Sequence, residues 1–350
     1  MKVAVLGVGL IGGSIGLAAR REGIKVAGFG RSPGRLALAA ELEAIDTPAA
    51  TLEEALDGAD ACFCCAPVGT LPGQIEAALQ AAGPECVVTD VGSVKRSLVE
   101  AIGDERFVGG HPIAGAETAG VEHARADLFQ GAVWYLAPGE RSSGLLYERL
   151  HRLVKSLGAR PVTVDAAAHD RLLAAVSHLP HVLANVLVAG TAGRDDAPRM
   201  GPSFRDATRV AGANSEIWTD IYMANREAIA EEIDATVERL RAAAQMLREG
   251  DPGAVTAWND DAAENRRTLQ AAEHEVGAVH ELRLTVPNRP GIVAQVALAL
   301  GKAGVNIVDM ALAPAPDMRT GAMTLWVAGD DQTARAKELI DDLGFPVVQA

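Results

Sequence analysis

Lys2-Val3-Ala4-Val5-Leu6-Gly7-Val8-Gly9-Leu10-Ile11-Gly12-Gly13 is the stretch that decides the fold of this chain. The apolar residues 3–6 predict a buried strand, and the G-x-G-x-x-G pattern after them opens a helical pattern over Ile11–Glu22. In that setting Gly7 makes a tight turn, Gly9 lets backbone N–H groups reach a pyrophosphate, and Gly12 lets helix and strand pack closely. The pattern therefore predicts a dinucleotide site, rather than an incidental glycine-rich turn, with a loop formed by Gly7, Gly9, Leu10, Ile11 and Gly12.

Short apolar runs alternate with helical patterns up to about residue 165. Helical patterns such as Ile11–Glu22 and Leu145–Leu157 separate the runs. This alternation is typical of βαβ crossovers, so we expect a mostly parallel sheet. The predicted strands are Lys2–Leu6, Lys25–Phe29, Ala61–Ala66, Val87–Asp90, Arg106–Gly109, Ala132–Ala137 and Pro161–Val164.

Two further regions follow. Strand signals vanish between Ala166 and Glu275, where Arg171–Thr191 and Ser215–Arg248 predict long helices around a loop at Gly190–Pro202. The amphipathic helices fit either a dimer interface or an intrachain core. The last residues return to strands and helices in the order βαββαβ, the ferredoxin-like arrangement. Its predicted elements are Glu281–Val286, Ile292–Ala303, Val305–Ala313, Gly321–Ala328, Asp331–Leu343 and Phe345–Gln349.

The sequence thus predicts a chain of three parts. An α/β Rossmann domain occupies residues 1–165, an all-α domain that contributes to dimerisation occupies 166–277, and a ferredoxin-like domain occupies 280–350.

The composition bears on several classes of protein. A formal charge of −14 argues against nucleic acid or an anionic membrane as a partner. We expect no apolar run near the roughly 20 residues that span a bilayer, and the chain begins at once with a strand instead of a signal peptide. A cytoplasmic protein is therefore expected. Because Cys62, Cys64, Cys65 and Cys86 lack paired C-x-x-C spacing, we expect core thiols and no metal site.

The end of the second predicted strand bears on the choice of dinucleotide. An acidic residue there would bind the adenosine 2′-hydroxyl of NAD, but Arg31 and Ser32 follow the strand and no acid appears before Glu41. Arg31, Ser32 and Arg35 are suited to hold a 2′-phosphate, so we expect NADP to be favoured. NAD is the alternative if these residues are only solvated. Pro67, after the third strand, is placed with the cofactor contacts.

Polar side chains among small residues mark a reacting centre. Ser93 follows the strand Val87–Asp90, and ligands of open α/β sheets sit at the carboxyl ends of strands; alone, it would read as a helix N-cap. His111 and Glu117 lie in Gly109–Glu117, just beyond the predicted sheet. Histidine is the side chain best suited to move a proton near neutral pH. The plainer interpretation is a structural loop histidine.

The helical region carries two more polar segments. Ser177 and His181 are four residues apart and share a helical face, while Pro180 between them should bend the helix. Asp206 and Arg209 are three residues apart, a spacing that allows an ion pair.

Together these segments resemble the prephenate and arogenate dehydrogenase family of tyrosine biosynthesis. The matching sequences occur in the expected order, and the C-terminal part, with NRPG at 288–291 and GVNI at 304–307, resembles an ACT domain. ACT domains commonly bind amino acids at their mutual interfaces. The matches to the dehydrogenase family are GVGLIGGSIGLA at 7–18, TDVGSVK at 89–95, GGHPIAGAE at 109–117, SHLPH at 177–181 and DATRVA at 206–211, with Trp218 behind it.

The resemblance implies an oxidative decarboxylation, in which a cyclohexadienol loses hydride to a nicotinamide and CO2 from its ring. His111 would accept a hydrogen bond from the ring hydroxyl, which requires a neutral imidazole and predicts activity that falls at acid pH. Arg209 would bind a substrate carboxylate, because a guanidinium offers two parallel donors. Ser93 and Ser177 would orient the hydroxyl and the His111 ring.

Supporting roles follow from the same resemblance. His181 would line the pocket, Glu117 would close its mouth, and Asp206 would orient Arg209. His178 is expected to pack rather than react. Asn288 and Asn306 of the ACT-like domain would contact an amino-acid effector, with tyrosine as the expected feedback inhibitor; the alternative is a domain that serves only assembly of the homodimer.

Several alternatives remain at this level. Prephenate is the commoner family substrate and is favoured, with arogenate as the alternative. A nucleotide-binding sensor without turnover would show degraded catalytic positions, yet Ser93, His111, Ser177 and Arg209 all match. A β-hydroxyacid dehydrogenase would carry a lysine base in the helical domain, and the SHLPH region offers none.

Overall fold

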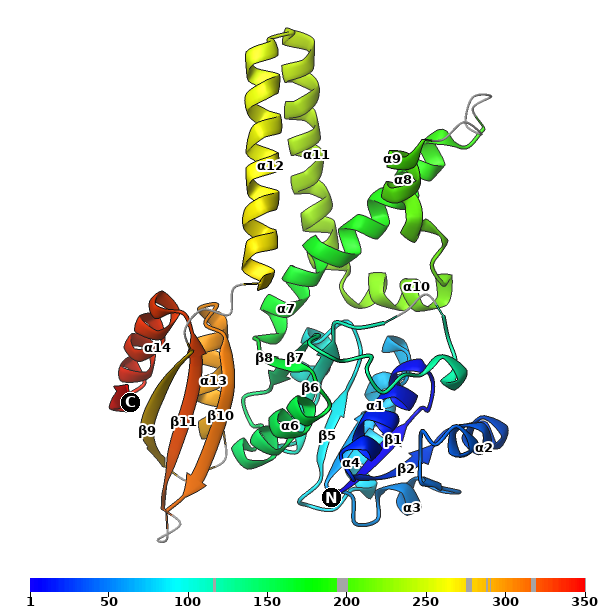
Figure 1. The fold of residues 1–350 in the computed structure, drawn as a ribbon, viewed down its shortest axis with the longest axis vertical. Helices are drawn as coiled ribbons and strands as arrows, with labels where there is room; N and C mark the ends of the chain where they lie inside the picture. The colour runs from blue at the N-terminus through cyan, green and yellow to red at the C-terminus, as the bar shows by residue number, and fades with distance from the viewer. Residues whose placement is uncertain are drawn as a thin grey trace. The chain divides into compact units, whose positions relative to one another are not determined.

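The computed structural model describes residues 1–349 except 116–117, 194–200, 275–278, 288, 290 and 316–318. Its contacts separate two compact units, whose helices and strands are labelled in Figure 1. The first unit comprises Met1–Leu173, Ala213–Ala224 and Val279–Ala350. The second unit comprises Ala174–Gly212 and Asn225–Ala278.

Eight strands of the first unit form one sheet in the order β3-β2-β1-β4-β5-β6-β7-β8. Neighbouring strands are parallel except β6 and β7, and the first six strands have the Rossmann order. The bounds are β1 (Lys2–Leu6), β2 (Lys25–Phe29), β3 (Thr47–Pro48), β4 (Ala61–Cys64), β5 (Val87–Asp90), β6 (Phe107–Pro112), β7 (Val133–Pro138) and β8 (Arg160–Thr163).

The sheet is buried on both faces. In β1, Val3 and Val5 belong to one core cluster while Ala4 and Leu6 belong to another, because successive side chains of a strand point to opposite faces. Helices α1, α2 and α6 contribute to the first cluster, which continues into the C-terminal domain, and α3, α4 and α5 contribute to the second. Their bounds are α1 (Leu10–Arg21), α2 (Pro33–Glu41), α3 (Leu52–Leu56), α4 (Leu71–Ala81), α5 (Arg96–Ala101) and α6 (Gly144–Ser156), with the 3-10 turns η1 (Val68–Thr70) and η2 (Val121–His123).

The predicted strands are confirmed, three of them to the residue, with one shift that matters. Strand β6 does not end at Gly109 but continues to Pro112. His111 therefore lies on a strand, paired with Tyr135 of β7, and not in the loop that the sequence suggested.

The C-terminal domain has the predicted ferredoxin-like topology, with strand order β10-β11-β9-β12. Helix α13 and strand β10 contact α6 of the nucleotide-binding domain, and the two domains belong to the same unit. The elements are β9 (Val279–Pro287), α13 (Ile292–Lys302), β10 (Ile307–Pro314), β11 (Thr320–Ala328), α14 (Asp330–Asp342) and β12 (Val347–Gln349).

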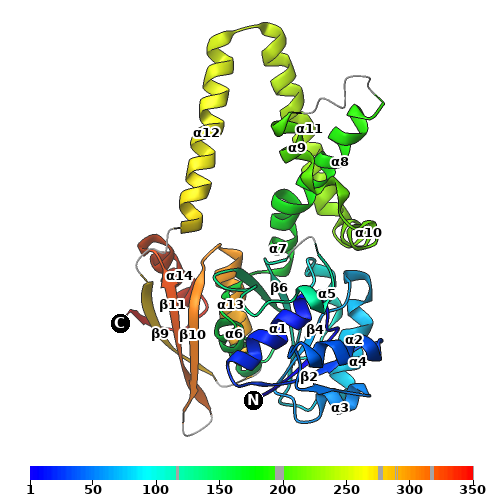
Figure 2. The ribbon, with the colours of Figure 1, turned by 45° about the vertical axis from the view of Figure 1, so that its right-hand side comes forward.

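The second unit is helical. Two long helices, α11 (Arg226–Glu249) and α12 (Pro252–His274), form a hairpin around Gly250 (Figures 1 and 2). The helix predicted over Ser215–Arg248 is in fact two helices, since α10 (Ser215–Ala224) ends before Asn225 and belongs to the first unit. The remaining elements of this region are α7 (Ala166–Leu173), which also belongs to the first unit, the π-helical turn η3 (Ala174–His178), α8 (Leu179–Thr191), α9 (Pro202–Thr208) and the 3-10 turn η5 (Arg209–Gly212).

One helical segment, Ala166–Thr191, corrects an expectation. Its 26 residues, with a mean hydropathy of 1.7 in the most apolar window, are long and apolar enough to cross a membrane by length and composition only. The sequence reasoning expected no such run. A single helix of this kind is weak evidence for a membrane span.

Hydrogen bonding inside this segment widens to the π-helical turn at Ala174–His178, directly before Pro180 in the first turn of α8. Proline has no N–H to continue the helical ladder. The disturbance predicted at Pro180 therefore takes the form of a π turn, a feature that is frequent at functional sites.

Candidate functional site

The glycine loop after β1 has the geometry of a pyrophosphate site. Gly7 has a φ of +104°, and a Cβ there would lie 2.9 Å from the carbonyl oxygen of Cys65. A Cβ on Gly12 would lie 2.2 Å from the oxygen of Gly7, so only glycine lets α1 approach the loop. A Cβ on Gly9 would meet no atom within 4 Å. Open space in front of the N-terminus of α1 fits an anionic pyrophosphate held by backbone N–H groups.

The carboxyl ends of β2 and β4 flank this loop. Ser32 caps α2 by accepting the backbone N–H of Arg35 at 3.4 Å. Arg31 and Arg35 are exposed beside it, and neither guanidinium forms an ion pair within the described part of the chain. Pro67 follows β4 as the first residue before η1. Both guanidinium groups thus lie beyond the carboxyl end of β2 without an acidic partner among the described residues.

Ser93 follows β5, the neighbour of β4. Its Oγ is buried and has no hydrogen-bond partner among the described residues. The N-cap interpretation of Ser93 is wrong, because α5 begins only after Lys95. The first N–H groups of that helix are satisfied from α7, where the Asp170 carboxylate accepts the N–H of Lys95 at 2.8 Å and that of Arg96 at 2.9 Å. A buried hydroxyl without a partner is an atom that a ligand can satisfy.

A buried ion pair fixes the ends of β5 and β6. The Lys95 ammonium pairs with the Asp90 carboxylate, and both side chains are fully buried. Asp90 also accepts the backbone N–H groups of Gly92 at 2.8 Å and Gly110 at 3.0 Å. Burial lowers the pKa of Lys95, although the Asp90 charge opposes this shift. The residue next to His111 is thereby tied to the segment that carries Ser93.

His111 is hydrogen-bonded to a second histidine. Its Nδ1 lies 2.9 Å from Nε2 of His169 on α7, and Nδ1 of His169 lies 2.8 Å from Oδ1 of Asp170. The Tyr135 ring packs edge-on against His169, with centroids 5.3 Å apart. Burial is the main cause of the lowered pKa of His169, while the hydrogen bond to Asp170 acts in the opposite direction.

The sequence reasoning missed His169, Asp170, Lys95 and Asp90. Polar residues in a helix or at a strand end are usually exposed, and nothing local marks these as buried. The adjacent histidine and aspartate at the start of the helical region are the only signal that could have drawn attention to α7.

A second group of predicted residues lies together in the helical unit. Burial first, and then the charge of Arg209, lower the pKa of His181, while a hydrogen bond with the backbone of Val210 opposes this shift. Ser177 lies in the π-helical turn and is half-buried. His178 is buried, with its Nδ1 3.2 Å from the Asn225 amide nitrogen, as expected of a packing residue.

The remaining predicted site residues are Asp206, Glu117, Asn288 and Asn306. Asp206 is exposed on α9, three residues before Arg209, and its pairing with that residue stays a prediction. Glu117 and Asn288 lie outside the described residues. Asn306 follows α13; its backbone N–H donates to Gln332 at 2.9 Å, and its Oδ1 is buried without a partner among the described residues.

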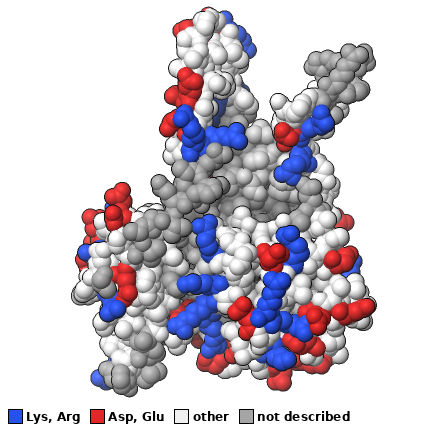
Figure 3. Space-filling model, in the orientation of Figure 1, with Lys and Arg blue, Asp and Glu red and all other residues white. Residues whose placement is uncertain are grey.

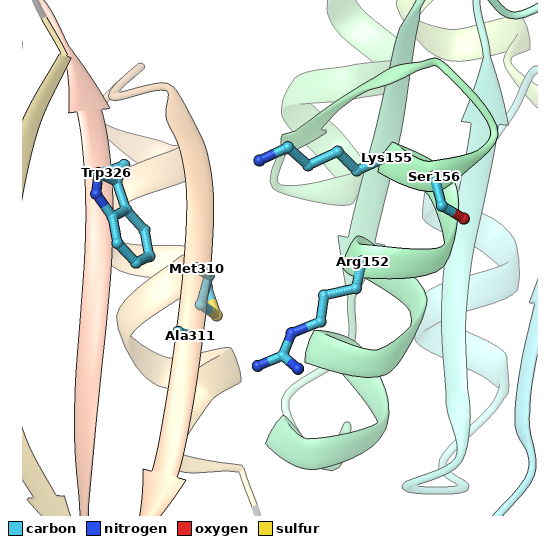
Figure 4. A pocket seen from close by; sticks show the side chains of 6 residues that line it. All are labelled: Arg152, Lys155, Ser156, Met310, Ala311 and Trp326. Atoms are coloured by element: carbon cyan, nitrogen blue, oxygen red, sulfur yellow. The ribbon is translucent and has the colours of Figure 1, made fainter.

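In the view of Figure 3, the described lysines and arginines of the lower part of the face lie next to acidic side chains. A cavity of about 390 Å³ lies between α6 and the face of β10 and β11 (Figure 4). None of the predicted site residues lines it. Its lining residues are Arg152, Lys155, Ser156, Met310, Ala311 and Trp326.

A Rossmann sheet with a phosphate loop, and with a hydrogen-bonded histidine at its carboxyl edge, defines a dinucleotide-dependent dehydrogenase. Family models agree in detail. Residues 15–163 match the nucleotide-binding domain of prephenate dehydrogenase, 165–259 match its dimerization domain, and 280–345 match the ACT domain. The chain belongs to the prephenate dehydrogenase family, as the motifs predicted.

Relatives extend over most of the chain. Prephenate dehydrogenase of Bacillus subtilis is 27% identical over 97% of this chain and 95% of its own length. A probable prephenate dehydrogenase, NovF, of Streptomyces niveus is 31% identical over 85% of this chain and 81% of its own length.

Solved structures of the family are also similar. Prephenate dehydrogenase of A. aeolicus, in complex with hydroxyphenyl propionate and NAD+, has a TM-score of 0.71 and 29% identity over 77% of this chain and 98% of its own. Synechocystis arogenate dehydrogenase has a TM-score of 0.71 and 27% identity over 77% of this chain and 100% of its own.

Proposed function

We propose that this chain catalyses the oxidative decarboxylation of prephenate to 4-hydroxyphenylpyruvate in tyrosine biosynthesis. The main structural support is the hydrogen bond between His111 and His169 at the carboxyl end of β6. This is the edge of the sheet that also carries the phosphate loop. The substrate loses hydride and CO2, and its ring becomes aromatic. A bound nicotinamide dinucleotide supplies the hydride acceptor.

The residues divide the work by their chemistry. His111 accepts the hydrogen bond, and then the proton, of the ring hydroxyl, so that carbonyl character builds as hydride leaves. The unpaired Oγ of Ser93 supports a contact to the same hydroxyl. Arg209 holds a substrate carboxylate with two parallel donors, and Ser177 orients the hydroxyl and the His111 ring.

The other predicted residues complete the pocket in this proposal. His181 lines it, and its lowered pKa keeps it neutral beside Arg209. Asp206 orients Arg209, and Glu117 closes the mouth of the pocket.

NADP is the proposed cofactor, with NAD as the alternative. The unpaired guanidinium groups of Arg31 and Arg35 and the hydroxyl of Ser32 support a 2′-phosphate contact. An acid that would favour NAD is missing from the end of β2.

The test is a matrix of prephenate and arogenate, each with NAD and NADP, assayed by the appearance of the reduced nicotinamide. Turnover of prephenate supports the proposal, whereas turnover of neither substrate refutes it. Arogenate is the second candidate substrate, because the Synechocystis arogenate dehydrogenase structure is as similar in TM-score as that of the A. aeolicus enzyme.

The role of His111 is tested by His111→Asn. The variant should bind substrate with little change while kcat falls by about 10²–10⁴-fold, the contribution expected of a positioned base. A variant that binds substrate and keeps near wild-type kcat would refute the role.

The ACT domain is proposed to bind tyrosine as a feedback inhibitor. The buried Oδ1 of Asn306, which has no partner among the described residues, supports an amino-acid contact there. Asn288 stays the second predicted contact residue. If saturating tyrosine changes neither the rate nor the KM for substrate, the domain serves assembly alone.

We also propose a cytoplasmic homodimer that binds neither nucleic acid nor membrane, with domains at 1–165, 166–277 and 280–350. The exposed apolar side chains of α8 support the dimer, since Val186, Leu187 and Val188 are 61%, 44% and 39% exposed in the single chain. A second copy covering them would also explain why this apolar helix is little buried. Sedimentation in the absence of detergent tests the homodimer and the absence of a membrane span. A chain with an exposed membrane helix would aggregate under these conditions, whereas a soluble homodimer would sediment as a single species.

A further inference from the structure

His169 lies where it can control which ring nitrogen of His111 carries the proton. Its side chain is fully buried on α7, and both of its ring nitrogens have partners. Among the described residues, His169 forms no hydrogen bond to the phosphate loop or to Ser93, so its burial by itself would indicate only a packing role. Its two hydrogen bonds, however, join a carboxylate to the proposed proton acceptor.

The protons of this chain can be assigned from the partners. Both oxygens of Asp170 accept backbone N–H groups at the start of α5, and a carboxylate is an acceptor only. Asp170 can therefore only accept from Nδ1 of His169. A neutral imidazole carries a single N–H, so Nε2 of His169 is an acceptor and Nδ1 of His111 must donate to it.

The consequence falls on the other nitrogen of His111. With its hydrogen on Nδ1, the neutral His111 ring carries no proton on Nε2, and this is the atom that can accept a hydroxyl proton. The opposite tautomer would present an N–H to the substrate hydroxyl and would be inactive as a base.

We propose that His169, oriented by Asp170, is a positioning residue that fixes His111 in the tautomer with an unprotonated Nε2. The inference rests on the proposed function, because it explains how His111, the proton acceptor of that reaction, is held in the active tautomer. When His111 takes up the proton, its Nδ1–H bond to His169 becomes charge-assisted and stronger. The relay therefore favours the charged state formed during hydride loss.

The groups that face His169 are consistent with a neutral ring. Lys95 and Asp90 form a closed ion pair beside it, Tyr135 packs edge-on against it from β7, and Asp170 accepts its proton. Burial lowers the pKa of His169 despite the two carboxylates. A protonated His169 would need Nδ1 of His111 as an acceptor, which would remove the bare Nε2.

Two substitutions of His169 separate positioning from packing. His169→Gln keeps the relay, because the side-chain amide donates N–H to Asp170 and offers its oxygen to Nδ1 of His111. His169→Phe fills the space but offers no acceptor. We expect His169→Phe to lower kcat by about 10- to 100-fold, the size typical of a partner that orients a histidine, with little change in the KM for either substrate. His169→Gln should recover most of the loss.

Equal kcat values in the two variants, or a wild-type kcat in a folded His169→Phe variant, would overturn the proposal. Cofactor binding and the thermal midpoint of each variant show that the fold persists. If His169→Phe does not fold, the comparison of His169→Gln with Asp170→Asn replaces it. An asparagine amide would donate to His169 and reverse the relay, so Asp170→Asn should be the slower variant.

A readout without turnover keeps the inference separate from the proposed function. In the wild-type chain with ¹⁵N-labelled histidine, NMR at neutral pH should show His111 with its proton on Nδ1 and a bare Nε2. A proton on Nε2 overturns the relay whatever the enzyme turns over. Conversely, failure of the wild type to turn over prephenate or arogenate, with the expected tautomer, refutes the proposed function and leaves the relay in place.

Discussion

The ammonium group of Lys95 is paired with the carboxylate of Asp90, and both side chains are completely buried. The pair lies between the segment that carries Ser93 and the strand that carries His111, because Asp90 also accepts the N–H of Gly110. The Asp90 charge is stable here because the carboxylate accepts two backbone N–H groups as well as the Lys95 ammonium. The site is thus built on a buried polar network rather than on a loop.

Breaking the pair should destabilise the nucleotide-binding domain. Lys95→Met leaves the Asp90 charge without its cation, and we expect a loss of about 3–5 kcal/mol in the free energy of unfolding. Urea unfolding measures it. Arg96→Ala is the matched control, since its pair with Glu100 is exposed and should change stability by less than about 0.5 kcal/mol. Equal effects in the two variants would contradict the structural role of the pair.

Adding a single methyl group to the glycine loop after β1 should weaken cofactor binding. Gly12→Ala places a Cβ 2.2 Å from the Gly7 oxygen, so the loop or α1 must move away. We expect dinucleotide affinity to fall at least about tenfold, equivalent to 1.4 kcal/mol, as measured by fluorescence titration. Gly73→Ala on α4, where a Cβ meets nothing within 4 Å, should leave affinity unchanged. Unaltered binding by Gly12→Ala would show that the dinucleotide lies elsewhere.

The choice of dinucleotide is tested by Arg31→Ala combined with Arg35→Ala. Loss of two charge-assisted contacts to a 2′-phosphate should raise the KM for NADP by about tenfold or more, while the KM for NAD changes little. Arg21→Ala, at the far end of α1, serves as the control. A parallel rise for both dinucleotides would contradict NADP selectivity at this position.

Stability should depend on pH through His169. Its folded-state pKa is lowered by burial, whereas the unfolded chain titrates near about 6.5. The unfolded state therefore binds more protons below that value, and stability falls as the pH falls from about 6.5 towards the folded-state pKa, with no contribution above it. Unfolding at acid and neutral pH measures the difference, and His169→Gln should reduce it. An unchanged pH dependence in that variant would assign the effect to other groups.

Arg209 should act on substrate binding more than on the chemical step. Arg209→Lys keeps the charge but loses the planar pair of donors, so we expect the KM for prephenate to rise by about tenfold with a smaller change in kcat. Arg205→Lys on the same exposed stretch is the control. A kcat effect that exceeds the KM effect would argue against a carboxylate anchor.

Much of the fold was predictable because its signals are local. The strand at 2–6, the glycine turn and the following helix each depend on neighbouring residues, and the βαββαβ order of the last domain follows from the same periodicities. Strand β6 was predicted too short, because Gly109 and Gly110 have low strand propensity and the pairing with β7 supplies the hydrogen bonds. The helix over Ser215–Arg248 was predicted too long, since nothing local shows that the chain changes unit at Asn225.

By itself, the sequence determined the Rossmann sheet, the phosphate loop, the family, and the candidate roles of His111 and Ser93. Only the tertiary structure decided what holds His111. His169 and His111 are 58 positions apart, and Asp170 reaches the start of α5 from 74 and 75 positions away. A polar residue is stable in the interior only where its partners are, and those partners are brought together by packing of α7 against β7 and α5 rather than by any local pattern.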